Sequence, residues 1–360
     1  MLRLYQYRLP FQKPFKTAAG EFNHRRGIIL HYRKGEIDLI SEAAPLPGFS
    51  SESFNDVKET LVNRRDEIGE NLGRIENLSD LWDGLAGTVG ELPSIQFSVT
   101  FLGAAILAHQ SGKSLFDLFG RSIKPKVHLN AVAGTLPTEE LKRQILLSVK
   151  QGFRVIKLKA SINTDQLIPV LEAVSKQEPN IQFRLDANRS WPIDEIRDRT
   201  SAFSHLPIEY VEEPSKFRGD EELEQMVRES RLPIALDESV QNTEQLNNLM
   251  GSCPEVTFII KPMLYGNLIR LFETIQSNRS LFRQIIVTTT LESAVGRSMI
   301  AVCTALFGDP NRGHGLRTGT IFERDILPDP TDQPVLDSEF FSMPAYRRFS
   351  SADISQLEPL

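Results

Sequence analysis

From about residue 127 onward, short apolar runs alternate with longer segments of mixed polarity. The runs are rich in β-branched and aromatic residues and fall near 127–133, 153–159, 181–187, 208–212, 232–237, 256–261, 283–289 and 313–317. Most of the segments between them have the length of a helix. The alternation predicts an α/β fold, a modified (β/α)8, TIM-like barrel of (β/α)7β form. An open doubly wound sheet is the alternative, because a count of elements does not prove closure.

The N-terminal third has a different pattern. Strand-like residues fill 2–9 and 27–32, around an expected loop at 13–22. The segment 52–74 has helical polarity, and Phe97, Phe101, Ala105 and Ala108 recur at the spacing of a helix with one buried face. We therefore expect three parts: an α+β capping domain at 1–122, the barrel at 123–320, and a C-terminal segment at 321–360 that packs back on the capping domain.

Five ionisable residues each end one of the barrel runs. They are Lys159, Asp186, Glu212, Asp237 and Lys261, at intervals of 27, 26, 25 and 24 residues. Barrel enzymes carry their chemistry at the carboxyl ends of the strands. Because side chains alternate along a strand, Lys157 shares a face with Lys159, and Arg184 and Asn188 share one with Asp186. The apolar positions must face the surrounding helices, so we expect the charged ones to point into the barrel.

Three carboxylates on adjacent strands repel one another unless a cation neutralises them or one stays protonated. Asp and Glu oxygens without a nearby His or Cys suit Mg²⁺, or alternatively Mn²⁺, rather than zinc. Asp186, Glu212 and Asp237 are therefore the expected metal ligands. Each group taken alone has an ordinary explanation: Lys157 and Lys159 could be solvated on an edge strand, and Asp237 could cap a helix.

Lysines on either side of such a metal indicate acid–base chemistry. A lysine is a useful base when its pKa falls toward neutrality, and the positive charges of Lys157 and the cation would lower the pKa of Lys159. Lys261 is expected on the opposite wall. A metal that binds a substrate carboxylate can stabilise the dianion formed when the adjacent carbon loses a proton. The pattern predicts proton abstraction next to a carboxylate, through an enediolate.

Charge and composition narrow the partners. The formal net charge is −6 and no basic stripe occurs, so the footprint of a nucleic-acid binder is missing. Cys253 and Cys303 show no metal-binding or disulfide spacing. No apolar stretch approaches the roughly 20 residues that span a bilayer. We expect a cytoplasmic protein with a small-molecule carboxylate as partner, and no nucleic acid or membrane. The basic loop at 13–24 would suit a lid over an anion.

Five ordered motifs resemble those of the enolase superfamily, in its muconate-lactonizing subgroup. They are Lys-x-Lys at 157–159, Asp-Ala-Asn at 186–188, Glu-Glu-Pro at 212–214, Asp-Glu-Ser at 237–239 and Lys-Pro at 261–262. The resemblance implies the same three metal ligands, with Lys159 as the base and Lys261 as the group that stabilises the enediolate. Segments 44–50, 212–216, 261–266 and 288–293 are similar to signatures of the subgroup's dehydratases. Elimination of water is thus the implied reaction.

Further roles follow from the resemblance. It implies substrate contacts at Lys157, Arg184, Asn188, Thr288, Gly315 and Leu316, and it favours Glu238 as a residue that supports the metal ligands rather than as a ligand itself. Thr288 could instead be a core hydroxyl, and Gly315 a turn glycine. The eighth strand lacks the Asp-x-Asp that epimerases of the subgroup use for a substrate amine. Rival functions are a racemase or epimerase of N-acylated amino acids, a non-catalytic binding barrel, and a Schiff-base aldolase.

Overall fold

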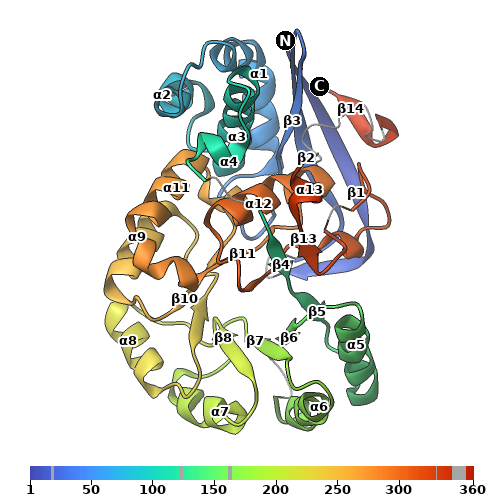
Figure 1. Ribbon diagram of the computed structural model, residues 1–360, viewed down its shortest axis with the longest axis vertical. Helices are drawn as coiled ribbons and strands as arrows, with labels where there is room; N and C mark the ends of the chain where they lie inside the picture. Colours follow the sequence, from blue (N-terminus) through green and yellow to red (C-terminus); the bar gives the residue numbers. More distant parts are fainter. Residues whose placement is uncertain (18–19, 122–124, 161–163, 330, 343–353) are drawn as a thin grey trace.

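The computed structural model describes residues 1–17, 20–121, 125–160, 164–329, 331–342 and 354–360. A capping domain lies at one end and a barrel at the other (Figure 1). Both termini lie at the end of the molecule that holds the capping domain. Among the described helices, none is both long enough and apolar enough to cross a membrane.

The capping domain is an antiparallel sheet packed against helices, with the strand order β14-β1-β2-β3. Its strands are β1 (Leu2–Thr17), β2 (Gly20–Lys34), β3 (Ile37–Ala43) and β14 (Leu357–Pro359), and its helices are α1 (Phe54–Leu72), α2 (Leu78–Val89), α3 (Pro93–Gln110) and α4 (Leu115–Leu118). The expected helix at 97–108 forms, but the expectation of one buried face was wrong. Helix α3 is buried on nearly every side, because it lies between β3, α1, α2 and α10 (Pro262–Tyr265) of the barrel.

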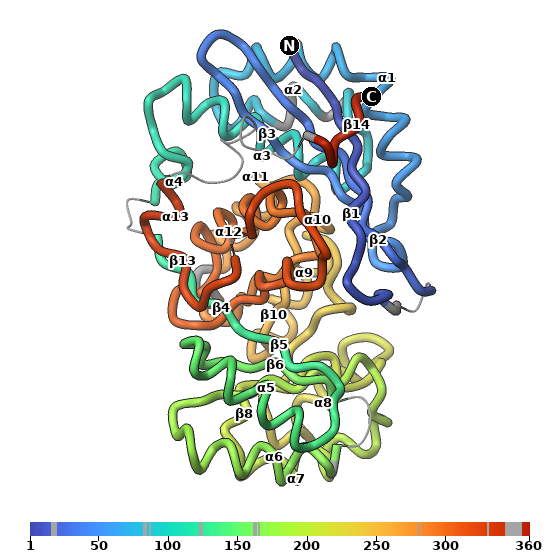
Figure 2. The backbone as a smooth tube through the Cα atoms, turned by 90° about the vertical axis from the view of Figure 1, so that its right-hand side faces the viewer, coloured from blue at the N-terminus to red at the C-terminus, as the bar shows by residue number. Residues whose placement is uncertain are grey.

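The loop expected at 13–22 is instead the outer part of a long hairpin. Strands β1 and β2 stay paired there, with Phe15 opposite Phe22, and such aromatic cross-strand pairs stabilise a ladder. Strand β3 pairs only with the inner part of β2, so the outer part is a two-stranded ribbon that reaches toward the barrel (Figure 2). There Phe11 stacks on Phe322, which follows the last barrel strand, with ring centres 5.3 Å apart.

The barrel strands are parallel and follow one another around the sheet. They are β4 (Val127–Leu129), β5 (Ala131–Ala133), β6 (Val155–Lys159), β7 (Gln182–Asp186), β8 (Ile208–Glu212), β9 (Ile234–Leu236), β10 (Thr257–Ile260), β11 (Ile285–Val287) and β12 (Gly313–His314). Strands β5 to β11 form one sheet, Thr288 bridges to Gly315, and β12 pairs with β4, which leads through Asn130 into β5. The sheet therefore closes, and the open-sheet alternative was wrong.

Helices surround the barrel on the outside (Figure 1). They are α5 (Thr138–Lys150), α6 (Thr164–Gln177), α7 (Ile196–Phe203), α8 (Asp220–Glu229), α9 (Thr243–Ser252), α11 (Leu268–Ser277) and α12 (Ala294–Phe307), with the short α10 after β10. Apolar side chains such as Leu185 and Val211 join the large core beneath these helices. A separate apolar cluster consists of Tyr210, Ala235, Ile259 and Ile286, which lie on the opposite face of their strands. The two clusters agree with the predicted strand parity.

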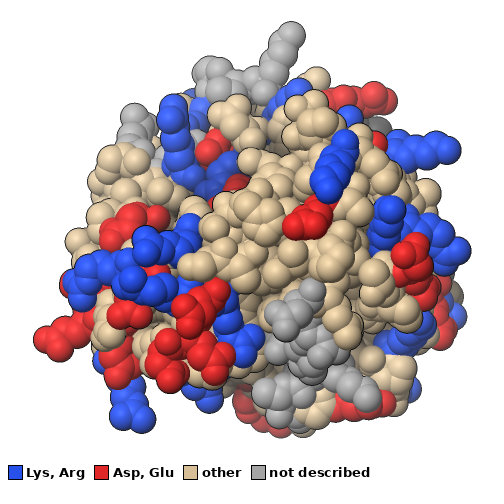
Figure 3. Space-filling view, turned by 90° about the horizontal axis from the view of Figure 1, so that it is seen from below, with Lys and Arg blue, Asp and Glu red and all other residues tan. Residues whose placement is uncertain are grey.

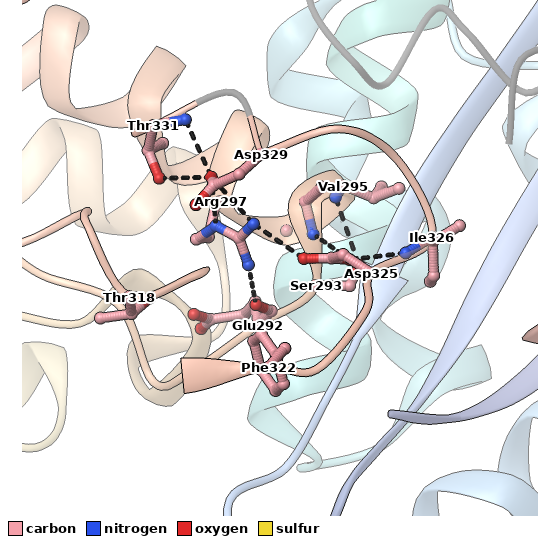
Figure 4. Close-up of polar contacts among 12 residues, drawn as sticks. Glu292, Ser293, Val295, Arg297, Thr318, Phe322, Asp325, Ile326, Asp329 and Thr331 are labelled. Carbon is pink, nitrogen blue, oxygen red and sulfur yellow. Dashed lines mark hydrogen bonds and ion pairs between the residues drawn. The ribbon is translucent and has the colours of Figure 1, made fainter. Parts of the chain in front are cut away.

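The segment after the barrel contacts both domains. Strand β13 (Val335–Leu336) pairs antiparallel with β4, and after α13 (Ser338–Ser342) the chain ends in β14, which pairs with β1. The stretch after β12 is tied to α12 by the fully buried Arg297, which donates to Asp325 and Asp329 (Figure 4).

On the face shown in Figure 3, acidic and basic side chains are interleaved.

Candidate active site

The five residues of the sequence ladder lie at the carboxyl ends of adjacent strands. Lys159 is paired with Asp186 across β6 and β7, and Asp186 with Glu212 across β7 and β8. Asp237 and Lys261 directly follow β9 and β10. Strand β6 lies between β5 and β7, so its lysines are not on an edge strand. Asp237 caps no helix either, because α9 begins at Thr243 and is capped by Asn242.

Lys157 connects two of the three carboxylates. Its Nζ lies 2.9 Å from Oδ2 of Asp186 and 2.7 Å from a carboxylate oxygen of Glu212. Asp186 and Glu212 are buried, and the Lys157 side chain is 20% exposed. Low solvent access makes these contacts stronger than those of a surface ion pair.

Lys159 and Lys261 approach the carboxylates from the two sides. Lys159 donates to Oδ2 of Asp186 at 3.0 Å and also to Oδ1 of Asn188. Lys261 donates to Oδ1 of Asp237. From their positions on β6 and after β10, the two amines flank the carboxylates that end β7, β8 and β9.

The environment separates the pKa values of the acids. Burial raises the pKa of Asp186, but Lys157 and Lys159 outweigh it and bring the pKa down to about 2. Burial raises the pKa of Glu212 to about 8; Lys157 opposes the shift, and repulsion from Asp186 and Asp237 adds to it. Burial would lower the pKa of Lys157, yet Asp186, Glu212 and Asp237 raise it well above its ordinary value. Positive charge thus dominates at Asp186, whereas burial and the neighbouring carboxylates dominate at Glu212.

The donor set fits a hard divalent cation. Oδ1 of Asp186 and Oε2 of Glu238 are buried without a hydrogen-bond partner in the described structure, and a cation would satisfy such an oxygen. Within the described residues, no three His, Cys, Asp or Glu side chains are already gathered as a metal site. The reason is visible in the contacts, since the amines of Lys157 and Lys261 occupy oxygens of all three carboxylates. A cation could bind Oδ1 of Asp186 directly and would compete with these amines for the oxygens that they contact.

The other residues implied by resemblance lie at different depths. Asn188 and Glu238 lie at the mouth and are joined by a hydrogen bond of 3.1 Å. Arg184 lies two residues deeper on β7, donates to Glu209 at 2.6 Å, and leaves its Nη2 buried without a partner in the described structure. Arg184 therefore fills the barrel interior beneath the carboxylates.

Three more of these residues lie where the barrel closes. Oγ1 of Thr288 is buried without a described hydrogen bond. A methyl group on Gly315 would lie 2.7 Å from Cγ2 of Thr288, so only glycine fits at that bridge. The side chain of Leu316 is wholly buried in the large core, which leaves only its backbone near the mouth.

The capping domain contributes two residues, Phe49 within the segment 44–50 and Arg25 beside the basic loop, for which the sequence alone indicated no individual role. The Phe49 ring centre lies 5.7 Å from Nζ of Lys261. The buried Arg25 donates to the carbonyls of Ala44 and Pro45, which precede Phe49, and to those of Thr290 and Leu291 after β11. A buried arginine satisfied by carbonyl oxygens has no local sequence signal, because its acceptors come from distant segments.

Comparison with known proteins agrees with the two-domain arrangement. Residues 1–102 match the family described as "MenC, N-terminal domain", and residues 140–253 match "Enolase C-terminal domain-like". The o-succinylbenzoate synthase of Pasteurella multocida is 27% identical, over 94% of this chain and 96% of that enzyme. The N-succinyl-L-Arg/Lys racemase of Bacillus cereus is 23% identical, over 69% of this chain and 68% of that enzyme.

Solved structures share the fold. The N-succinyl Arg/Lys racemase from Bacillus cereus superimposes with a TM-score of 0.78 and 18% identity, covering 100% of this chain and 95% of that one. At such low identity the likeness establishes only the fold. Enzymes of the enolase superfamily pair a Lys or His base with Mg²⁺. The two family matches and the full-length relatives together show that the chain belongs to the enolase superfamily and is an enzyme.

Proposed function

We propose that this protein is an o-succinylbenzoate synthase, a lyase that eliminates water from 2-succinyl-6-hydroxy-2,4-cyclohexadiene-1-carboxylate in menaquinone biosynthesis. The observation that carries the proposal is the placement of Lys159 and Lys261 on either side of three strand-end carboxylates. The full-length relatives of that name and the match of the N-terminal domain support the choice of substrate.

Lys159 acts as both base and acid. Its amine removes the proton next to the ring carboxylate, and the ammonium then returns that proton to the departing hydroxyl, which leaves as water from the same face. The ring becomes aromatic and no oxidant is needed. Because base and acid are one group, the elimination is syn. The side chain of Lys159 is 44% exposed, so it can reach a substrate bound at the mouth.

Lys261 stabilises the enediolate from the opposite side. Its Nζ is a positive group held near Asp237 and beneath the Phe49 ring, where water is largely excluded. Asp186, Glu212 and Asp237 would hold Mg²⁺ or Mn²⁺, which supplies positive charge to the carboxylate dianion as it forms. Asn188, Thr288, Gly315 and the backbone of Leu316 remain the proposed lining of the substrate site. Arg184 was expected there too, but it is buried beneath the carboxylates and paired with Glu209. A cytoplasmic location is part of the proposal.

A racemase of N-acylated amino acids is the second candidate. The similarity to the N-succinyl-L-Arg/Lys racemase favours it, and amines on opposite faces could remove and return a proton with inversion. An epimerase that binds a free substrate amine is disfavoured, because the eighth strand offers no free carboxylate for that amine. His314 there is buried and bonded to the protein backbone, and Arg317 is paired with Asp332.

Two parallel assays test the assignment. The protein is incubated with the diene in Mg²⁺ while its ultraviolet absorbance is followed, and separately with an N-succinyl-L-amino acid while optical rotation is followed. We expect the diene absorbance to fall, and Lys159→Ala to abolish the change. No turnover of the diene would refute the synthase. Loss of optical rotation without diene turnover would establish the racemase instead.

A further inference from the structure

Glu213 lies directly after the proposed ligand Glu212 and is not used by the chemistry described above. Its side chain is completely buried, and its backbone has a φ of 42°. A left-handed backbone is costly for a non-glycine residue, so it persists only where surrounding contacts enforce it. Among the described residues, four non-glycine positions have a positive φ, and three of them are Asn188, Arg189 and Glu213, at the ends of adjoining strands.

The carboxylate of Glu213 joins three strand ends. It accepts hydrogen bonds from the backbone N–H of Asp237 at 2.9 Å, from the backbone N–H of Ser239 at 3.3 Å, and from the Ser239 hydroxyl. Nε of Arg189, which follows β7, donates to it at 2.8 Å. Arg189 also donates from Nη2 to the Ser239 hydroxyl at 2.8 Å. One buried anion therefore connects the turns after β7, β8 and β9.

These contacts control the backbone at a proposed metal ligand. The turn after β9 runs from Asp237 to the start of α9 without regular structure, so the sheet alone does not fix it. The bond from Asp237 N–H to Glu213 holds this turn against the end of β8. The backbone of Glu213 adds two further links, donating to the carbonyl of Ala235 at 2.8 Å and accepting from the N–H of Arg189 at 2.7 Å.

We propose that Glu213 is a positioning residue that fixes the backbone of Asp237 against the end of β8, so that Asp237 can bind the same divalent cation as Asp186 and Glu212. The inference rests on the proposed function, in which these three carboxylates are the ligands. A negative charge is needed at Glu213 because every group that faces its carboxylate is a donor. A glutamine would turn an NH₂ group toward an N–H, and at least one of the four contacts would break.

The test measures Mg²⁺ affinity by isothermal titration calorimetry on the metal-free, full-length protein. Glu213→Gln is compared with Glu42→Gln, a matched control. Glu42 is also completely buried and also accepts from two backbone N–H groups and a serine hydroxyl, those of Ser293 and Gly296 at the start of α12. Both variants lose one buried anionic hub, but only Glu213 contacts the turn that carries Asp237. A third variant, Asp237→Asn, tests whether Asp237 is a metal ligand at all.

We expect Glu213→Gln to weaken Mg²⁺ binding about 10- to 100-fold, and Glu42→Gln to leave it unchanged while lowering the melting temperature. Unchanged affinity in Glu213→Gln, with weaker binding in Asp237→Asn, would overturn the positioning role and leave the proposed function standing. Unchanged affinity in Asp237→Asn would remove the metal site and the inference together. If Glu213→Gln does not fold, Ser239→Ala takes its place. A few-fold loss of affinity in that variant supports the role, and wild-type affinity overturns it.

Discussion

Replacing Lys157 by methionine should make the stability of this protein depend on Mg²⁺. In the metal-free protein the Lys157 amine compensates Asp186 and Glu212, at 2.9 Å and 2.7 Å. Methionine keeps most of the unbranched stem but removes the charge. Glu212 then loses the amine that is paired with it, and Asp186 keeps only Lys159 as a counter-ion.

The contacts set the size of the effect. Removing one partner from a buried ion pair costs about 3–5 kcal/mol, because the remaining charge stays desolvated. The Lys157 side chain keeps 20% exposure, and Glu212 can relieve the repulsion by taking up a proton, so we expect the lower end, about 3 kcal/mol. A cation at a hundred times its dissociation constant restores about 2.7 kcal/mol. Mg²⁺ should therefore recover most of the loss.

Urea denaturation followed by circular dichroism measures both quantities. The wild type and Lys157→Met are each unfolded in EDTA and in saturating Mg²⁺. The gain from Mg²⁺ should be larger in the variant, because the cation no longer competes with an amine. Lys113→Met is the control: this lysine is exposed in the loop between α3 and α4, and its loss should change stability by less than about 0.5 kcal/mol.

The reasoning is refuted if Lys157→Met matches the wild type in EDTA, since the amine would then not be compensating buried charge. It is also refuted if Mg²⁺ stabilises the variant no more than the wild type. The second result would mean that the cation binds elsewhere than among these carboxylates.

Further outcomes follow from the same structure. Lys159→Ala should abolish the exchange of the substrate proton with D₂O, which NMR can follow. Lys261→Ala should lower turnover at least about 100-fold and leave Mg²⁺ affinity intact. Weaker Mg²⁺ binding in the Lys261 variant would contradict its assigned role. Gly315→Ala should lower stability by about 1–3 kcal/mol in urea titrations, because the new methyl group meets Thr288 at 2.7 Å. Burial raises the pKa of Glu292 from 4.5 to about 7, so the folded state holds this proton more tightly than the unfolded state does. The free energy of unfolding should therefore fall as the pH rises from about 4.5 to about 7. Glu292→Gln should remove up to about 3 kcal/mol of that pH dependence, and a stability difference from the wild type that stays constant with pH would contradict this.

The sequence could predict the ladder because its signals are local. Strand parity and one polar residue at each strand end placed Lys159, Asp186 and Glu212 on neighbouring rungs, and the pairing of β6, β7 and β8 has them there. The outer part of the β1–β2 hairpin was missed because its lysines and glycine are typical of loops. The aromatic pair Phe15 and Phe22 and the contact of Phe11 with Phe322 stabilise strands there instead.

Roles that depend on distant segments had no such signal. Glu213 reads as part of a motif, but its function requires a positive φ and backbone donors more than twenty residues away in the chain. Helix α3 was expected to have one buried face from the spacing of its apolar residues, but its small polar residues are buried as well. Two of them, Ser98 and Thr100, are buried and hydrogen-bonded, to Ser41 and to the helix's own carbonyls.

The charge count at the mouth links metal binding to substrate binding. Three amines, those of Lys157, Lys159 and Lys261, face the acids at the mouth, and the pKa values of two of these acids, Glu212 and Glu238, are raised. Neither sign of charge is therefore in large excess without a ligand. A divalent cation alone would add two positive charges to a poorly solvated site, and a dicarboxylate alone would add two negative charges. Each becomes favourable when the other is present, and this coupling must be reciprocal. The product should therefore tighten Mg²⁺ binding by the same factor by which Mg²⁺ tightens product binding, and independent binding in paired titrations would show that the amines do not set this balance.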